Sequence, residues 1–189
     1  MSELFRSVVI DPPWMERGGG RITRGAQRHY DLLDKAGIVK ATTQCEHWDH
    51  VADDAHLYLW TTNNHLPSGL EVMSALGFKY VTNICWCKDR IGLGQYFRGQ
   101  HELCLFGVRG KGYNVRTDDK TISSVVSAKK TQHSQKPDEF YSMVRRRSDG
   151  PYLDMFGRQS RDGWVVWGDE APTEIAVVST SVDVRGAPI

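Results

Sequence analysis

The chain has 189 residues, of which 40% are hydrophobic and 25% are charged, and its formal net charge is +1. This composition is typical of one compact domain and excludes a strongly basic nucleic-acid-coating protein, so any affinity for nucleic acid must come from local clusters of positive charge. No stretch approaches the roughly 20 apolar residues of a membrane span, and residues 1–7 lack an apolar signal segment, so we expect an intracellular protein with no membrane partner.

Apolar runs alternate with helical patterns along the chain, which predicts an α/β fold with a largely parallel sheet and helices on both faces. We predict strands at residues 7–11, 56–61, 79–88, 101–108, 152–156 and 164–168. The first helix is predicted to start at the capping residue Asp34 and to run toward Trp48. A second helix follows from Leu66 to the breaker Gly77, and a third starts with Pro137 at its first position.

The segment Asp11-Pro12-Pro13-Trp14, which follows the first predicted strand, is typical of a site that holds a flat amine. The two prolines remove two backbone donors, so we expect the carbonyls of Asp11 and Pro12 to be left free as acceptors. The exocyclic amine of a nucleobase has two N–H donors, which match one carboxylate and one carbonyl. Trp14 is predicted to supply a face on which the base stacks. The alternative is a strand that ends at prolines and carries a core tryptophan.

Three segments are predicted to be loops, at residues 15–28, 89–99 and 110–132. The first of them carries four arginines and one acid, namely Arg17, Arg21, Arg24, Arg28 and Glu16. Because this loop follows Trp14 directly, we interpret it as a lid that contacts phosphates. A solvated basic loop without function is the alternative, since runs of charge are usually of that kind.

The pattern of cysteines and histidines does not indicate a disulfide or a metal. Cys85 and Cys87 alternate on a predicted strand, so we expect reduced cysteines. Cys45, His47 and His50 would need a fourth ligand to form a structural zinc site, and no second cysteine pair has the usual spacing. We therefore predict no metal.

Several motifs resemble those of the adenine N6-methyltransferases of the MT-A70 family, and they occur in the same order. The resembling segments extend from Val8 to Glu170 and include Asp11-Pro12-Pro13-Trp14, His29-Tyr30, residues 57–62, Trp86 with Lys88, Gly94, and residues 101–110, 133–139, 154–158 and 163–170. This resemblance implies a Rossmann-like, S-adenosylmethionine-dependent methyltransferase domain over residues 1–170, followed by a flexible tail at residues 171–189. It also implies a permuted order, in which the catalytic motif precedes the cofactor turn.

The resemblance assigns roles to individual residues. Catalysis is assigned to Asp11, Pro12, Pro13 and Trp14. Cofactor binding is assigned to Ile10, Asp11, Lys136, Asp154, Phe156, Gly157, Arg158, Arg161, Asp169 and Glu170. Substrate binding is expected from Trp14, Arg17, Arg21, Arg24, His29, Tyr30 and Lys88. In the family, the lysine at position 136 lies against the methionine part of the cofactor, whose carboxylate suits an ammonium. An ordinary surface ion pair is the alternative for Arg161.

The chain also departs from the family pattern at three places. Asp154 stands where relatives usually have Glu, Asp169 stands where many have Asn, and Ser160-Arg161 replaces the His-Asn of the eukaryotic enzyme. These differences all fall in the predicted cofactor half of the site.

The expected function is methylation of the N6 amine of adenine in nucleic acid, with DNA favoured over RNA and S-adenosylmethionine as the methyl donor. The resemblance to small bacterial and phage members implies a cytoplasmic enzyme of a bacterial or phage-infected cell, and a homodimer and a complex with a partner subunit are both open as its assembly. Two alternatives remain, an inactive pseudo-methyltransferase that binds nucleic acid or a partner, and a cytosine N4-methyltransferase. Inactive relatives tend to lose the Asp-Pro-Pro-Trp motif or the lysine, whereas cytosine enzymes usually begin the motif with Ser.

Overall fold

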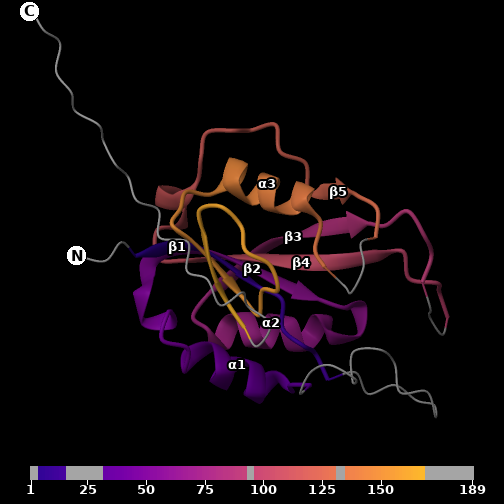
Figure 1. The fold of residues 1–189 in the computed structure, drawn as a ribbon, viewed down its shortest axis with the longest axis horizontal. Helices are drawn as coiled ribbons and strands as arrows, with labels where there is room; N and C mark the ends of the chain where they lie inside the picture. The colour runs from indigo at the N-terminus through magenta and orange to yellow at the C-terminus, as the bar shows by residue number, and fades with distance from the viewer. Residues whose placement is uncertain (1–3, 16–31, 93–95, 131–134, 169–189) are drawn as a thin grey trace, which may run out of the picture.

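The computed structural model describes residues 4–15, 32–92, 96–130 and 135–168, in which helices cover both faces of one twisted sheet (Figure 1). The strands are β1 (Phe5–Ile10), β2 (Val51–Thr61), β3 (Lys79–Cys87), β4 (His101–Arg109), β5 (Val125–Ser127), β6 (Tyr152–Met155) and β7 (Trp164–Trp167). The helices are α1 (Lys35–Thr43), α2 (Leu66–Ala75) and α3 (Asp138–Arg147), and short 3-10 turns lie at Trp48–His50, Asn63–His65 and Gly112–Val115. The predicted α/β class is confirmed.

The seven strands are arranged in the order β5-β3-β4-β2-β1-β6-β7. Strand β4 runs antiparallel to both of its neighbours, whereas the other pairs in the described sheet are parallel. Strands β1, β2, β3, β6 and β7 therefore end at one edge of the sheet, and β4 begins there. In open α/β sheets this edge is where ligands bind.

Two layers of core hold the helices on opposite faces of the sheet. Because side chains alternate along a strand, Ile10 of β1 faces α1 and α2, while Val9 faces α3. Helices α1 and α2 lie below the sheet in Figure 1, and α3 lies above it. All of these strand residues are fully buried, so the central strands give the residues at their ends a rigid support.

The helix ends follow from local chemistry. The Oδ1 atom of Asp34 accepts a hydrogen bond from the Gly37 N–H at 2.8 Å, which is the predicted cap. Helix α2 is followed by Gly77, whose φ of 81° suits a residue without a side chain. Helix α3 begins one residue later than predicted, with Pro137 as its cap.

The six predicted strands are confirmed within a few residues, but the prediction of a loop over residues 110–132 is wrong in part. That segment contains β5 and a 3-10 turn. Strand β5 has three residues, and its exposed Val125 is as apolar as its buried Val126, so the sequence shows no alternation there. Residues 16–28 of the predicted basic loop, and the tail at residues 171–189, lie outside the described residues.

No helix in the described ranges is long and apolar enough to cross a membrane. All four cysteines, Cys45, Cys85, Cys87 and Cys104, are free. Within the described part of the chain, no three His, Cys, Asp or Glu side chains are grouped as metal ligands would be.

Candidate active site

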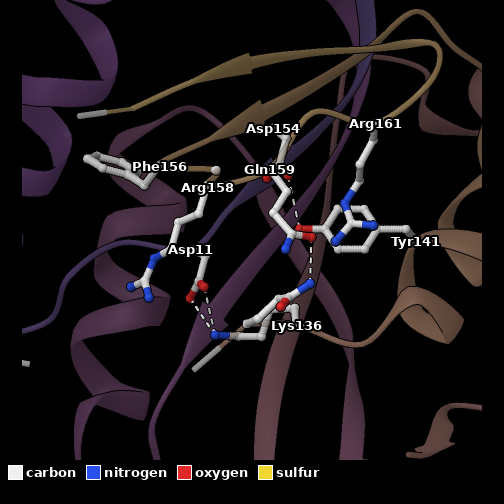
Figure 2. Close-up of a pocket in the computed structure, with 10 residues that line it drawn as sticks. Asp11, Lys136, Tyr141, Asp154, Phe156, Arg158, Gln159 and Arg161 are labelled. Atoms are coloured by element: carbon white, nitrogen blue, oxygen red, sulfur yellow. Dashed lines mark hydrogen bonds and ion pairs between the residues drawn. The ribbon is translucent and has the colours of Figure 1, made fainter. Parts of the chain in front are cut away.

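A pocket lies at the edge of the sheet where β1 and β6 end, beside the start of α3 (Figure 2). It is lined by Asp11, Gln135, Lys136, Tyr141, Asp154, Phe156, Gly157, Arg158, Gln159 and Arg161. Most of these are residues that the sequence assigned to a cofactor. The structure thus brings together the end of the first strand and the last third of the chain.

A chain of alternating charges runs from the pocket along the same edge. The Lys136 ammonium donates hydrogen bonds to both oxygens of Asp11, each at 2.7 Å, and its Nζ lies 3.6 Å from Glu102 Oε2. The other oxygen of Glu102 accepts from the ammonium of Lys88. Lys136 also lies over the ring of Trp60, with its Nζ 5.1 Å from the ring centroid. These contacts hold Asp11 in one orientation at the mouth of the pocket.

The electrostatics of this chain favour its charged form. Burial disfavours the Lys136 ammonium, but the negative charges of Asp11 and Glu102 outweigh that effect and raise the pKa of Lys136. Burial likewise opposes ionisation of Glu102, yet Lys136 and Lys88 lower its pKa. Both groups are therefore ionised at neutral pH, and the ion pair is a fixed feature of the site.

The acid at the back of the pocket, Asp154, is only 1% exposed. Its Oδ2 accepts a hydrogen bond from the Tyr141 hydroxyl at 3.0 Å, whereas its Oδ1 is buried without a partner among the described residues. Burial raises the pKa of Asp154 to about 7. An unsatisfied buried carboxylate oxygen is costly, so this atom calls for a hydrogen-bond donor from a ligand.

Arg161 closes one side of the same pocket. Its guanidinium lies over the ring of Tyr141, 3.6 Å from the centroid, and pairs with Asp138 at the start of α3. The Nε atom of Arg161 is buried and has no partner within the described residues. Arg161 thus forms an ion pair through Nη1, while its Nε can still donate a hydrogen bond to a ligand in the pocket.

The turn after β6 needs a glycine. A Cβ atom at Gly157 would lie 2.6 Å from Val166 Cγ1 and 3.0 Å from the carboxyl carbon of Asp154. Phe156, the preceding residue, has a φ of 59°, which is uncommon for a bulky side chain and marks a strained turn. The backbone of this turn therefore packs against Val166 of β7 and the Asp154 carboxyl, which leaves no room for a side chain at position 157.

Comparison with known proteins identifies the family of this chain. The sequence profile of MT-A70 matches residues 5–170. The chain belongs to the MT-A70 family. It is 30% identical over 182 residues to the N(6)-adenosine-methyltransferase catalytic subunit METTL3 of Homo sapiens, and 28% identical over 202 residues to the type II methyltransferase M.MunI of Mycoplasma sp.

The two relatives are covered to different extents. The match to the human subunit includes 88% of this chain but 28% of the relative, so the chain spans just over a quarter of that protein. The MT-A70-like N(6)-adenosine-methyltransferase of Arabidopsis thaliana shows the same relation, with 26% identity, 88% of this chain and 24% of the relative. M.MunI is matched over 95% of this chain and 83% of its own length.

S-adenosylmethionine, the cofactor that membership in the MT-A70 family implies, fits the residues of the pocket. The orphaned Asp154 Oδ1 and Arg161 Nε supply an acceptor and a donor for its polar groups. Gly157 lines the pocket and carries no side chain, so a ligand there can approach its backbone. Arg158 and Lys136 add positive charge for its carboxylate.

The Asp-Pro-Pro-Trp motif of this MT-A70 chain forms a tight turn, and one expectation about it is wrong. The Pro12 carbonyl is not unengaged, because it accepts the Trp14 N–H at 2.9 Å. The Pro13 carbonyl accepts the Leu33 N–H, also at 2.9 Å. A carbonyl has two lone pairs, so Pro12 retains one for a substrate amine.

Trp14 lies in the core and does not present an open face. It is 7% exposed, its Nε1 donates to the Trp60 carbonyl at 2.9 Å, and its ring stacks on His65 with centroids 5.2 Å apart. Its N–H is satisfied by β2, and its apolar ring packs against the His65 ring and the core, which explains the burial. Trp14 therefore attaches the Asp-Pro-Pro-Trp turn to the sheet. Stacking of a base on Trp14 would require His65 to move, and it stays a prediction.

The remaining site predictions divide into those that can be placed and those that cannot. Ile10 is fully buried in the core below the pocket, and Lys88 lies at the far end of the charge chain. Arg17, Arg21, Arg24, His29, Tyr30, Asp169 and Glu170 lie outside the described residues.

Sequence reasoning missed Glu102, Tyr141, Gln135 and Gln159. Glu102 begins the strand that runs against its neighbours, so only the topology shows that it reaches the catalytic edge. Tyr141 lies in an apolar stripe of α3 and reads as core, although a buried tyrosine hydroxyl needs a partner and so signals one. Gln135 donates to Gln159 at 2.5 Å, which joins the segment before α3 to the turn after β6.

Proposed function

We propose that this chain is an S-adenosylmethionine-dependent methyltransferase that acts on the exocyclic N6 amine of adenine in nucleic acid, with DNA favoured over RNA. The observation that carries the proposal is the Asp11–Lys136 ion pair at the mouth of a pocket whose other residues suit the cofactor. The similarity to a type II methyltransferase over most of that relative's length supports DNA.

Each end of the pocket has a task in this mechanism. Asp154 and Arg161 would hold the nucleoside half of the cofactor, and Lys136 would face its carboxylate. S-adenosylmethionine supplies an electrophilic methyl group on its sulfonium. Asp11 and the Pro12 carbonyl accept the two amine hydrogens of adenine, which leaves the nitrogen lone pair less delocalised into the ring.

Lys136 makes Asp11 a fixed acceptor rather than a mobile base. Both carboxylate oxygens are oriented by one ammonium, which is itself held by Glu102. Because an aromatic amine is weakly basic, most of the rate comes from positioning, and the proton leaves after the methyl has been transferred. Extruding the base from a duplex costs a few kcal/mol, which stacking of roughly 1–3 kcal/mol per base offsets.

The retained motif speaks against the inactive alternative. Asp11 and Lys136 are both present and in contact with each other. A protein that only bound nucleic acid would not need this buried ion pair next to Asp154 Oδ1, a buried acceptor that has no partner among the described residues. A buried pair of this kind adds little net stability, so we attribute it to function.

The test is transfer of labelled methyl to matched single- and double-stranded DNA and RNA oligonucleotides, followed by nucleoside digestion and mass spectrometry. We expect N6-methyladenine, with more product from DNA than from RNA. N4-methylcytosine as the product would contradict the adenine assignment. No transfer to any substrate, together with no cofactor binding by calorimetry, would favour the inactive protein.

A further inference from the structure

The connection between β3 and β4 continues as a hairpin beyond the catalytic edge of the sheet (Figure 1). The Lys88 N–H donates to the Gln100 carbonyl at 2.8 Å, and further out the Gly92 N–H donates to the Gly99 carbonyl at 2.6 Å. Arg98 Nε also donates to the Gly92 carbonyl at 2.6 Å. These bonds keep the two arms paired past the ends of the strands, so the hairpin is a built projection.

Two aromatic side chains at this hairpin are almost fully exposed. Tyr96 is 94% exposed and Phe97 is 89% exposed, and Ile91 on the opposite arm is exposed as well. Burial of apolar side chains is favourable, so two adjacent aromatic rings left in water indicate a surface that a partner covers.

Positive charge surrounds these rings. The exposed cations are Arg90, Arg98, Lys129 and Lys130, and Lys88 lies at the base of the hairpin. The Lys130 N–H donates to Asp89 Oδ1 at 2.9 Å, which holds the segment after β5 against the hairpin. That bond, together with the charges of Arg90 and Lys129, lowers the pKa of Asp89.

Charge decides which partner this surface fits. Exposed aromatic rings interleaved with arginine and lysine match single-stranded nucleic acid, whose bases stack on the rings and whose phosphates pair with the cations. A second copy of this chain would bring the same cations face to face, which opposes association.

The hairpin also has the right place. Its base is joined to the catalytic acid through Lys88, Glu102 and Lys136, which contact one another in turn before Asp11. Tyr96 lies four positions before Gln100, a step that an extended chain spans in at most about 14 Å. Nucleotides next to the methylated one are therefore within reach of Tyr96 and Phe97.

We propose that the hairpin surface formed by Arg90, Ile91, Tyr96, Phe97 and Arg98 binds the single-stranded nucleotides that flank the target adenine. Tyr96 and Phe97 stack on the flanking bases, and Arg90, whose side chain is 86% exposed, pairs with a phosphate. The inference rests on the proposed function, because it assigns the neighbours of the adenine that the pocket receives.

The test measures the Kd of 5′-fluorescent 12-nucleotide single strands of DNA and of RNA by anisotropy. For the double variant Tyr96→Ala/Phe97→Ala we expect the Kd to rise about 10- to 100-fold for the strand that the enzyme prefers. Tyr80→Ala, an exposed tyrosine at the other end of β3, is the matched control and leaves the Kd within about twofold. Arg90→Gln lowers the slope of log K against log salt by about 0.7.

A second strand, with abasic residues on both sides of the adenine, separates stacking from phosphate contacts. This strand keeps the phosphates but lacks the flanking bases. We expect the parent to bind it more weakly than the intact strand, and the double variant to bind both strands with the same Kd. Equal losses in parent and variant would overturn the proposal, as would an unchanged Kd in the variant. If the parent is a dimer, the double variant is a monomer and the Kd for the strand is the same for both, the surface binds a second copy of the chain instead.

The outcome for the hairpin is independent of the outcome for the reaction. Calorimetric binding of S-adenosylmethionine and methyl transfer are measured on the same proteins. A parent that binds the strand through Tyr96 and Phe97 but transfers no methyl would retain the surface and remove the proposed function. If the parent methylates adenine and the double variant binds the strand with the same Kd as the parent, the proposed function is retained and the hairpin surface is refuted.

Discussion

The carboxyl of Asp154 is buried at the back of the pocket, where it is only 1% exposed. It is enclosed by Tyr141, which donates to it, and it feels the charges of Asp11, Arg161 and Lys136 at longer range. Burial dominates and raises its pKa to about 7. Asp154 is therefore partly protonated at neutral pH, although the pocket would use its charged form as the better acceptor.

Cofactor affinity is predicted to depend on this ionisation. As pH rises through about 7, Asp154 becomes charged and accepts a ligand hydroxyl more strongly, so the Kd for S-adenosylmethionine should fall several-fold between pH 6 and pH 8. Asp154→Asn should bind more weakly and show a flat profile over the same range. Calorimetry at several pH values checks this, and a parent profile without slope would contradict it.

The same group makes stability fall as pH rises. The folded protein binds the proton more tightly than the unfolded chain does, because the pKa is about 7 in the fold against an ordinary 3.8. The carboxyl therefore lowers the free energy of unfolding progressively between about pH 4 and pH 7. Relative to Asp154→Asn, the parent should lose roughly 2–4 kcal/mol over that window, measured by urea denaturation.

At the scale of elements, the turn after β6 depends on Gly157. In Gly157→Ala the new Cβ would meet Val166 Cγ1 and the Asp154 carboxyl, so β6 and β7 must shift. We predict a loss of about 1–3 kcal/mol in unfolding free energy together with at least tenfold weaker cofactor binding. Gly37→Ala in α1 is the control, because its Cβ would come no closer than 3.2 Å to a neighbouring atom and Gly37 does not line the pocket. Cofactor binding by Gly157→Ala that matches the parent would refute the assigned role of the turn.

A buried polar network lies at the opposite end of the sheet. Ser148 Oγ lies 2.6 Å from both His56 Nδ1 and the Tyr58 hydroxyl, and His56 Nε2 donates to the Gly112 carbonyl at 2.7 Å. Burial lowers the pKa of His56 to about 4, so this histidine stays neutral in the fold at physiological pH. The network connects β2 with the end of α3 and is remote from the pocket.

Ser148→Ala is predicted to cost stability and leave the reaction unchanged. It removes the partner of two buried polar atoms, which costs about 1–3 kcal/mol in unfolding free energy. The exposed Ser74→Ala in α2 should stay within about 0.5 kcal/mol of the parent. Thermal unfolding and methyl transfer below the melting temperature are the measurements. A fall in turnover of tenfold or more in folded Ser148→Ala would connect this network to the site.

The elements show what the sequence can and cannot predict. The strand positions and the Asp34 cap follow from local patterns of burial and hydrogen bonding, and they were predictable. The direction of β4 depends on how the chain crosses the sheet, so the sequence does not predict that Glu102 lies at the same edge as the pocket. Trp14 was expected to face a substrate, but its partner Trp60 comes from a strand distant in sequence, and only the fold brings the two together.

At the scale of the whole molecule, function and stability occupy different edges of one sheet. The parallel strands end where Asp11, Lys136 and Asp154 meet, and the connection between β3 and β4 projects from that same edge (Figure 1). The two helical layers bury the strands on both faces, so changes at either edge are separated by a rigid core. We therefore expect variants of the catalytic edge to lose activity while they retain the fold.

The central claim is that Asp11 positions the adenine amine for methyl transfer. Asp11→Asn tests it most directly, because the amide keeps the shape of the side chain but loses the charge and turns one acceptor into a donor. Lys136 keeps Glu102 as a partner in this variant, and circular dichroism checks that it folds. Asp49→Asn, an exposed aspartate outside the pocket, is the matched control.

The measurement is single-turnover methyl transfer to the preferred oligonucleotide at saturating S-adenosylmethionine. We predict that Asp11→Asn is folded and at least about 100-fold slower than the parent, a loss of ~2.7 kcal/mol of transition-state stabilisation, while Asp49→Asn equals the parent. Transfer by Asp11→Asn within about tenfold of the parent, a deficit of only ~1.4 kcal/mol, would contradict the account.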